Sequence, residues 1–282
     1  MASPIDDGVV LVTGASSGIG RAIAREVAPR AKVLVVVARR AEQLAKLKEE
    51  LLALRPSLIV EVVVCDLSKP EQVDVLVAEV AKRGHEVDVL VNNAGVGLMG
   101  VFDRSDASKV RSMLDLNVTS LTMLTHAVLP GMVARGRGGI LNISSGFGVS
   151  ALPSFAAYIG TKHFVTGFSE GLVADLAGTG VSVTQVLPGP VKTEFADQIG
   201  NFTGQDAPAI AEISAERCAR VAVSAFDRRC AMVVPGVTMK MVMLVNALSP
   251  RFSRRIFAVV LGRMARKAEL KALKESNRSE RN

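Results

Sequence analysis

The stretch that decides the fold is Val9-Val-Leu-Val-Thr-Gly-Ala-Ser-Ser-Gly-Ile-Gly-Arg-Ala-Ile-Ala-Arg-Glu-Val27. Its first five residues are apolar and mostly β-branched, which predicts a short buried strand, and Arg21–Val27 predicts a helix. The glycines between them allow a tight turn and a close approach of the backbone to a ligand. Because a helix N-terminus offers free N–H groups and partial positive charge, this turn is predicted to bind a phosphate.

The same alternation of short apolar runs and amphipathic stretches continues along the chain. Further strands are predicted at Lys32–Ala38, Leu58–Val64, Val87–Val91, Ile140–Ile143, Val181–Leu187 and, with its turn, Val233–Gly236. Helices lie between them, as in Ala41–Leu54, and Ser68 is expected to cap the helix that opens with Ser68–Glu71. Strands that are apolar on both faces predict an α/β protein with a parallel sheet covered on two sides.

Charge divides the chain into two parts. The net charge is +7, but residues 1–236 sum to −1 and residues 237–282 to +8. This predicts a near-neutral domain over 1–236 and a basic tail, and it argues against a basic nucleic-acid-binding surface. Within the domain the periodicity lapses around 192–211, where a mobile lid over the site is expected.

Composition excludes several other classes. Apolar residues make up 49% of the chain, which rules out a disordered protein. Cys65, Cys218 and Cys230 form no C-x-x-C pair, so neither a disulfide framework nor a zinc ribbon is expected, and no metal site is predicted. The first residues resemble no signal peptide, so we expect a cytoplasmic protein.

A second motif overlaps the glycine turn. Gly14-Ala-Ser-Ser-Gly18 matches the G-x-S-x-G nucleophile elbow, which leaves a serine hydrolase with Ser16 as nucleophile as a distant alternative. Such an enzyme would need His85, His126 or His163 as its base. A P-loop is excluded, because no Gly-Lys-Ser/Thr follows the turn.

At this point the chain resembles the short-chain dehydrogenase/reductase family over about residues 8–195. The resemblance rests on six motifs in order: Thr13–Gly20, Asn92-Asn-Ala-Gly95, Asn117, Ser144-Ser145, Tyr158-Ile-Gly-Thr-Lys162, and Pro188-Gly189 with Thr193 beyond it. It implies a Rossmann-type doubly wound parallel sheet in a single domain, and hydride transfer with a nicotinamide cofactor. It also makes a homodimer or homotetramer the default assembly.

The resemblance assigns catalysis to Asn117, Ser145, Tyr158 and Lys162. The residue chemistry agrees, because Tyr158 and Lys162 lie one helical turn apart and a nearby ammonium would lower the pKa of the phenol. Tyr158 would then exchange a proton with the substrate oxygen, which Ser145 would polarise. From the family, Asn117 would hold a water that links Lys162 to solvent. Taken singly, each of these residues could be ordinary packing or a strand end.

The end of the second predicted strand indicates which nicotinamide cofactor is used. Ala38-Arg39-Arg40 contains no acid before Glu42, and arginine suits a 2′-phosphate, so NADP(H) is predicted. Arg39 is the expected main contact, Arg40 is expected to stack near the adenine, and Asp66 to contact the adenine. The predicted cofactor-binding set is Gly14, Ser16, Ser17, Gly18, Ile19, Gly20, Arg39, Arg40, Asp66, Leu67, Asn93, Ala94, Gly95, Tyr158, Lys162, Pro188, Gly189, Val191 and Thr193.

The substrate side is expected to be apolar. Ser145, Phe147 and Phe195 are the predicted substrate contacts, and Ile199 and Phe202 recur along the expected lid. This favours a hydrophobic, lipid-like ketone or secondary alcohol, although the same residues could simply pack the lid on the domain. The alternative from another class is a catalytically silent NADP(H)-binding or sensing protein on the same fold.

The basic tail, residues 237–282, is predicted to be amphipathic and helical. Met239–Leu248 and Phe252–Leu261 are apolar segments flanked by basic residues, and neither is long enough to span a membrane. Three roles stay open for residues 237–264: peripheral contact with an anionic membrane, a cover for the substrate cleft, or packing on another subunit.

Overall fold

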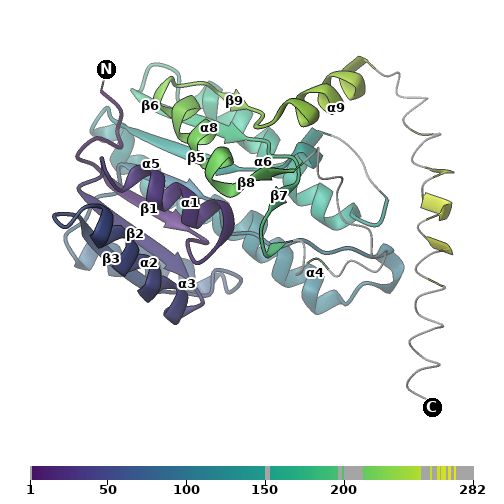
Figure 1. The fold of residues 1–282 in the computed structure, drawn as a ribbon, viewed down its shortest axis with the longest axis horizontal. Coiled ribbons are helices and arrows are strands. Elements are labelled where there is room, and N and C mark those ends of the chain that lie inside the picture. The colour runs from purple at the N-terminus through teal and green to yellow at the C-terminus, as the bar shows by residue number, and fades with distance from the viewer. Residues whose placement is uncertain are drawn as a thin grey trace, which may run out of the picture.

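A seven-stranded parallel sheet forms the centre of the molecule in the computed structural model (Figure 1). The structure describes residues 2–149, 153–195, 199, 212–248, 255, 259–260, 262–264, 266–267 and 270. The strand order is β3-β2-β1-β4-β5-β6-β9. The strands are β1 (Val9–Thr13), β2 (Val33–Ala38), β3 (Ile59–Val64), β4 (Val89–Asn92), β5 (Gly138–Ile143), β6 (Val181–Val186) and β9 (Met232–Val233).

Helices cover both faces of this sheet. One face carries α1 (Gly18–Val27), α2 (Ala41–Leu54) and α8 (Ala215–Asp227). The other carries α3 (Glu71–Lys82), α5 (Leu121–Ala134) and α6 (Ala156–Asp175). The predicted doubly wound α/β fold is therefore confirmed.

The two hydrophobic cores explain why the strands are apolar throughout. Val10 and Val12 of β1 enter the core beneath α1, α2 and α8, whereas Leu11 enters the opposite core. Successive side chains of a strand point to opposite faces, so a strand that is covered on both sides must be apolar at every position. All six residues of β2 are buried for this reason.

The order of the strands reverses next to β1. The chain moves outward from β1 to β2 and β3, then returns to the other side of β1 with β4. At such a reversal the connecting loops diverge and leave a crevice at the carboxyl ends of the strands. The Thr13–Gly20 turn and the segment after Asn92 both leave the sheet at this edge.

One long helical run crosses the second face. It consists of α4 (Ala107–Leu114), a π-helical turn at Asp115–Ser120 and α5. Among the described residues, only this run, Ala107–Ala134, has the length and hydropathy of a membrane span. It contacts β4, β5, α3 and α6, as a core helix of a globular domain does.

Some details differ from the sequence prediction. Ser68 does not cap α3, which begins at Glu71 after Pro70. Instead, the backbone N–H and the hydroxyl of Ser68 both donate to Asp66 Oδ1, at 3.1 and 2.8 Å. This local turn satisfies the serine, so the preference of serine for a helix N-cap was outweighed by a side-chain turn.

The later part of the chain adds two small features. The parallel pair β7 (Val191–Lys192) and β8 (Ile213–Ser214) brackets the predicted lid. Most of that lid, including Phe202, lies outside the described residues. The tail begins with α9 (Val237–Leu248), which projects from the body in Figure 1. Phe252 and Ile256, on the predicted second amphipathic face, also lie outside the described residues.

Phe226 anchors α8 on the sheet and provides a test of the packing. Its side chain is 1% exposed and fills the space above Gly139, where a β-carbon would collide with the ring. We expect Phe226→Ala to lower the free energy of unfolding by about 3–5 kcal/mol, because it leaves a cavity under the helix.

Phe102→Ala makes the same chemical change at a residue that is 61% exposed. We expect it to change stability by less than about 0.5 kcal/mol. Equilibrium urea unfolding of both variants measures the difference, and equal losses would contradict the assignment of Phe226 to the core.

Candidate active site

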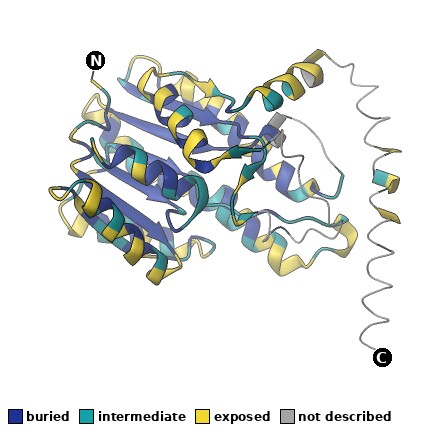
Figure 2. Cartoon of the chain, in the orientation of Figure 1, coloured by how far each residue is buried: buried dark blue, intermediate teal, exposed yellow. Residues whose placement is uncertain are grey.

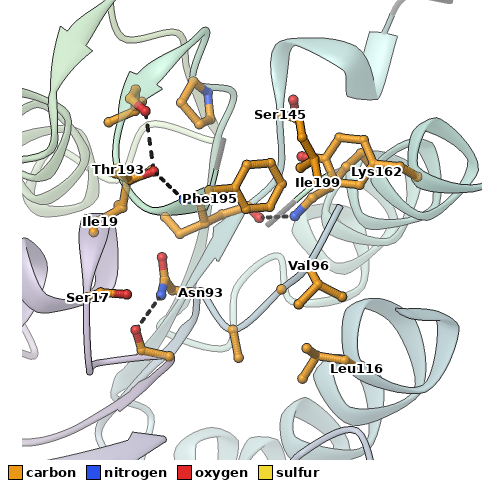
Figure 3. Close-up of a pocket in the computed structure, with 18 of the residues that line it drawn as sticks. Ser17, Ile19, Asn93, Val96, Leu116, Ser145, Lys162, Thr193, Phe195 and Ile199 are labelled. Carbon is orange, nitrogen blue, oxygen red and sulfur yellow. Dashed lines mark hydrogen bonds between the residues drawn. The ribbon is translucent and has the colours of Figure 1, made fainter. Parts of the chain in front are cut away.

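A cavity of about 860 Å³ occupies the crevice at the carboxyl edge of the sheet. Figure 3 shows Ser17 and Ile19 from the start of α1 on one side, and Ser145, Lys162, Phe195 and Ile199 on the other. The cavity therefore runs from the glycine turn to the start of α6.

Two glycines of the turn have backbone conformations that side chains disfavour. Gly14 has φ +65° and Gly18 has φ +55°. A β-carbon on Gly14 would lie 2.8 Å from Asn93 Nδ2 and 2.9 Å from the Cα of Ala94. The turn is thus close-packed against the β4 loop and leaves its own backbone at the cavity surface.

Thr13 and Asn93 tie the turn to β4. The Thr13 hydroxyl donates to the carbonyl of Val91 at 3.0 Å and accepts from the N–H groups of Asn93 and Ala94, each at 3.0 Å. The Asn93 side chain donates to the carbonyl of Thr13 at 2.9 Å and to that of Gly14 at 3.2 Å. Asn93, predicted as a cofactor residue, therefore braces the turn with its amide.

The start of α1 is suited to an anion. Ser17 is its N-cap residue, and in the described part of the chain no side chain caps the helix. The first N–H groups of α1 therefore face the cavity without an intramolecular partner side chain. Gly20 does not line the cavity, and a β-carbon there would collide with Asn93 Nδ2 and the Gly14 carbonyl.

The two arginines after β2 lie at the same end of the cavity but differ in their contacts. Arg40 turns back over the glycine turn, where its guanidinium donates to Ser17 Oγ at 2.7 Å and to Ser16 Oγ at 3.1 Å. It also pairs with Glu194 at 2.7 Å. The structure thus places Arg40 on the turn itself, whereas Arg39 is exposed at the cavity wall. The stacking of Arg40 near the adenine stays a prediction.

Asp66 stands beside Arg39 after β3. Burial raises the pKa of its carboxyl, but the hydrogen bonds from Ser68 and the positive charges of Arg39 and Lys69 outweigh burial, and the net pKa lies below the usual range. Asp66 is therefore ionised at neutral pH and can accept hydrogen bonds at the rim of the cavity.

Tyr158 and Lys162 of α6 meet Ser145 at the end of β5. All three are buried, with 6%, 7% and 9% of their surfaces exposed. The Ser145 hydroxyl is hydrogen-bonded to the Tyr158 phenol. The Lys162 ammonium lies 5.9 Å from the centre of the Tyr158 ring and donates to the carbonyl of Ile143 at 2.9 Å.

Burial shifts both pKa values toward the neutral forms. It raises the pKa of Tyr158 to about 12, against a smaller lowering by the Ser145 hydrogen bond. It lowers the pKa of Lys162 to about 8. The sequence-based expectation of a lowered phenol pKa is wrong for the protein alone, because loss of solvent outweighs the Ser145 hydrogen bond, which favours the phenolate.

Asn117 sits in the π-helical turn behind this group. Its Oδ1 accepts from the N–H of Val96 at 3.0 Å, and its Nδ2 donates to the carbonyl of Val96 at 2.9 Å and to Thr161 Oγ1 at 3.1 Å. Thr161 in turn donates to the carbonyl of Tyr158 at 2.7 Å. The side chain of Asn117 therefore links the β4 loop to α6, and it does not line the cavity.

The end of the cavity next to Tyr158 is apolar. Phe195 packs on the Tyr158 ring with centroids 5.8 Å apart, and Phe155 does so edge-on at 6.3 Å. The remaining apolar lining there is Val96, Met99, Leu116, Ile199 and Met239. Phe147 belongs to the 3-10 turn Gly146–Val149, but its side chain lies outside the described residues.

The cavity gathers most of the predicted site residues. They are Gly14, Ser16, Ser17, Gly18, Ile19, Arg39, Arg40, Asp66, Leu67, Asn93, Ala94, Gly95, Ser145, Tyr158, Lys162, Pro188, Gly189, Val191, Thr193 and Phe195. Sequence reasoning missed Met99, Phe155, Glu212 and Met239, which also line it. None of these four residues directly follows a predicted strand, so the position of the strand ends did not point to them.

The structure gives no support to the hydrolase alternative. The described side-chain partner of the Ser16 hydroxyl is Arg40, which cannot accept a proton. His85 lies instead beside Glu61 at 3.4 Å. Among the residues that the structure describes, no three His, Cys, Asp or Glu side chains lie close enough together to hold a metal ion.

Comparisons with known proteins agree with this geometry. The family model for short chain dehydrogenase matches residues 8–203. Sulfoacetaldehyde reductase of Chromohalobacter salexigens is 40% identical over 188 residues, 66% of this chain and 73% of that protein. NADP-dependent 3-hydroxy acid dehydrogenase YdfG of Salmonella typhi is 38% identical over 200 residues, 70% of this chain and 78% of that protein.

A solved structure is also similar. The short-chain dehydrogenase from Sphingobium yanoikuyae in complex with NADPH matches with a TM-score of 0.75 and 32% identity, over 85% of this chain and 92% of that one. The fold, the matched residues and these relatives lead to one conclusion: the chain belongs to the short-chain dehydrogenase/reductase family of oxidoreductases.

Proposed function

We propose that this protein interconverts a hydrophobic ketone and its secondary alcohol with NADP(H), and that residues 1–236 form the catalytic unit. One observation carries the proposal. Tyr158, Ser145 and Lys162 converge at the apolar end of a cavity whose other end is made of the glycine turn and Arg39 and Arg40. Such a cavity can hold an anionic dinucleotide and an apolar carbonyl compound next to a proton donor.

The buried tyrosine performs the proton transfer. When bound, the nicotinamide cofactor supplies or accepts the hydride. Because burial raises its pKa to about 12, Tyr158 carries its proton at neutral pH and can donate it to the oxygen of a ketone. Ser145 holds that oxygen and polarises the carbonyl, and Lys162 holds the ribose next to the reacting carbon.

The residues at the other end suit a dinucleotide that carries a 2′-phosphate. The uncapped start of α1 can hold the pyrophosphate, which needs N–H donors and positive charge. Arg39 is exposed at the end of β2 and is available for a phosphate, whereas Arg40 is already engaged with Ser16, Ser17 and Glu194. We therefore assign the main 2′-phosphate contact to Arg39.

The lining favours a hydrophobic substrate. The names of the two relatives indicate polar substrates, a sulfonated aldehyde and hydroxy acids. Around Tyr158 in this chain, the described lining includes Phe155, Phe195 and other apolar side chains, and the acidic residues that line the cavity are Asp66 and Glu212. An extended ketone would bury this apolar surface, whereas a small anion would leave it wet.

We also propose a homo-oligomer that pairs the outer sides of α5 and α6. Met123 and Val133 of α5 and Phe164 and Val173 of α6 are 37% to 44% exposed. Phe164 stacks on Phe168 with ring centroids 5.7 Å apart, which makes a flat apolar surface. A second copy on this surface would bury residues that a monomer leaves in water.

Tyr158→Phe tests the reaction. The variant keeps the shape of the ring but removes the acid, so we expect kcat for ketone reduction to fall about 10³-fold. The NADPH dissociation constant should change less than about threefold, because the phenol is not a phosphate contact. Spectrophotometric oxidation of NADPH with methyl ketones of increasing chain length measures both the reaction and the preference for apolar substrates.

Three outcomes of this assay contradict the proposal. NADPH binding without turnover on any ketone would indicate a silent sensor on the same fold. Full activity in Tyr158→Phe would remove the tyrosine from the mechanism. A decline of kcat/KM with longer chains would contradict the hydrophobic substrate.

Arg39→Asp tests the cofactor assignment. Loss of a charge-assisted phosphate contact costs about 1.5–3 kcal/mol, so we expect the variant to bind NADPH at least about tenfold more weakly and to prefer NADH. Isothermal titration with both cofactors measures the ratio. Lys48→Asp makes a similar change of charge at an exposed position of α2 and should keep the preference for NADPH. Equal affinities of the wild-type chain for both cofactors would contradict the assignment.

The lowered pKa of Lys162 predicts how NADPH binding depends on pH. Below about pH 8 the ammonium is charged and donates to the ribose, and above it the charge is lost. We therefore expect the NADPH dissociation constant to stay constant near neutral pH and to rise about tenfold toward pH 10. In Lys162→Met this rise should be absent, and a flat profile in the wild-type protein would refute the prediction.

A further inference from the structure

Helix α9 leaves most of its apolar side chains in water. Val237, Met241, Leu244, Val245 and Leu248 are 52% to 76% exposed. At helical spacing these five positions share one side of the helix. Figure 2 shows α9 as a largely exposed element at the edge of the body. A globular monomer rarely leaves a continuous stripe of this kind uncovered.

The opposite side of α9 faces the active-site cavity. Met239 and Met243 lie on that side and are partly buried. Met239 lines the cavity, and its side chain fills the space above Gly146, which follows Ser145, and Gly189, where a β-carbon would lie 3.2 Å from the Cβ of Met239. The exposed stripe therefore lies on the side of α9 opposite the side chain that lines the cavity.

The segment of the chain that contains this stripe is strongly basic. Residues 237–282 contain 11 Lys and Arg against 3 Glu. Lys240 borders the stripe, and further along the same segment Arg255, Arg263 and Lys267 are exposed, as are Val259, Val260 and Met264. Two described acidic groups are already paired, Asp103 with Arg266 at 3.0 Å and Glu194 with Arg40 at 2.7 Å, whereas Glu212 lines the cavity together with Met239 of α9.

Charge decides between the partners that could cover the stripe. A second copy of the same face would bring a second set of positive charges next to the first, and the two would repel. An anionic lipid surface carries the complementary charge and also offers an apolar layer for Val245 and Leu248. A lysine such as Lys240 can reach the headgroups while its neighbours insert.

We propose that α9 docks this protein on anionic membrane surfaces, so that the mouth of the cavity opens toward the lipid and receives a ketone dissolved there. The statement about the ketone rests on the proposed function, but the docking itself does not. The bound chain would take its substrate from the membrane and return the alcohol to it.

Vesicle sedimentation of the full chain tests the docking. We expect the protein to bind vesicles of phosphatidylcholine with phosphatidylglycerol at least about tenfold more tightly than vesicles of phosphatidylcholine alone, and to be released by salt. Leu244→Asp with Leu248→Asp should abolish binding. Val75→Asp changes a residue of α3 that is 65% exposed, away from α9, and should bind as the wild-type protein does.

A fluorescent reporter keeps the test valid if the aspartate variant is unstable. The chain contains no tryptophan, so Val245→Trp places a single probe on the stripe. Its emission should shift to shorter wavelength with anionic vesicles, whereas that of Val75→Trp should not. Absence of vesicle binding, equal binding to both vesicle types, or an aspartate variant that still binds would each overturn the proposal.

Two further measurements test whether a second copy covers the stripe and whether the proposed catalysis is independent of docking. A loss of oligomer in lipid-free sedimentation velocity for the Leu244→Asp, Leu248→Asp variant would assign the stripe to a second copy and overturn the proposal. NADPH oxidation with a water-soluble ketone should be unchanged in this variant, whereas turnover of a long-chain methyl ketone in anionic vesicles should fall. If the wild-type chain turned over neither ketone, the proposed function would be refuted. The docking would then be decided by vesicle sedimentation alone.

Discussion

The site depends on one buried hydroxyl. Thr13 is 1% exposed, and its oxygen bonds three backbone groups of the β4 end, at Val91, Asn93 and Ala94. These bonds set the separation between the glycine turn and the β4 loop where the strand order reverses. Each satisfies a polar group that would otherwise be buried without a partner, which would cost about 1–3 kcal/mol. The hydrogen bonds at the strand ends therefore fix the shape of the crevice.

Burial determines the acidity of the proposed proton donor. In water a phenol and an ammonium would have nearly equal pKa values, but here burial separates them, to about 12 for Tyr158 and about 8 for Lys162. Tyr158 thus holds a proton firmly enough to deliver it only to a strong acceptor, such as the oxygen of a carbonyl under reduction. The Asn117 and Thr161 bonds hold the α6 backbone at this position.

The sequence predicted the parts of the site that follow directly from strand ends. Gly14, Ser145 and Gly189 each come just after a strand, and parallel strands bring their carboxyl ends to one edge, so linear order determines spatial proximity. The direction in which a side chain points was harder to predict from the sequence. Arg40 lies on the turn, where it bonds Ser16 and Ser17 and pairs with Glu194, far along the chain. Met239 reaches the cavity from α9, whose direction after β9 could not be predicted from the sequence.

The orientation of the tail could not be predicted from the sequence either. Its charge was evident from composition, but composition could not show that one side of α9 faces the cavity while the other remains in water. Because α9 both lines the cavity and presents an apolar stripe, the surface that covers the stripe would also lie next to the cavity. If the outer side stays in water, the apolar stripe lowers the solubility of the protein and contributes nothing to catalysis. If it lies on lipid, the apolar lining around Phe155 and Phe195 continues into the membrane, and a hydrophobic ketone can reach Tyr158 without crossing water.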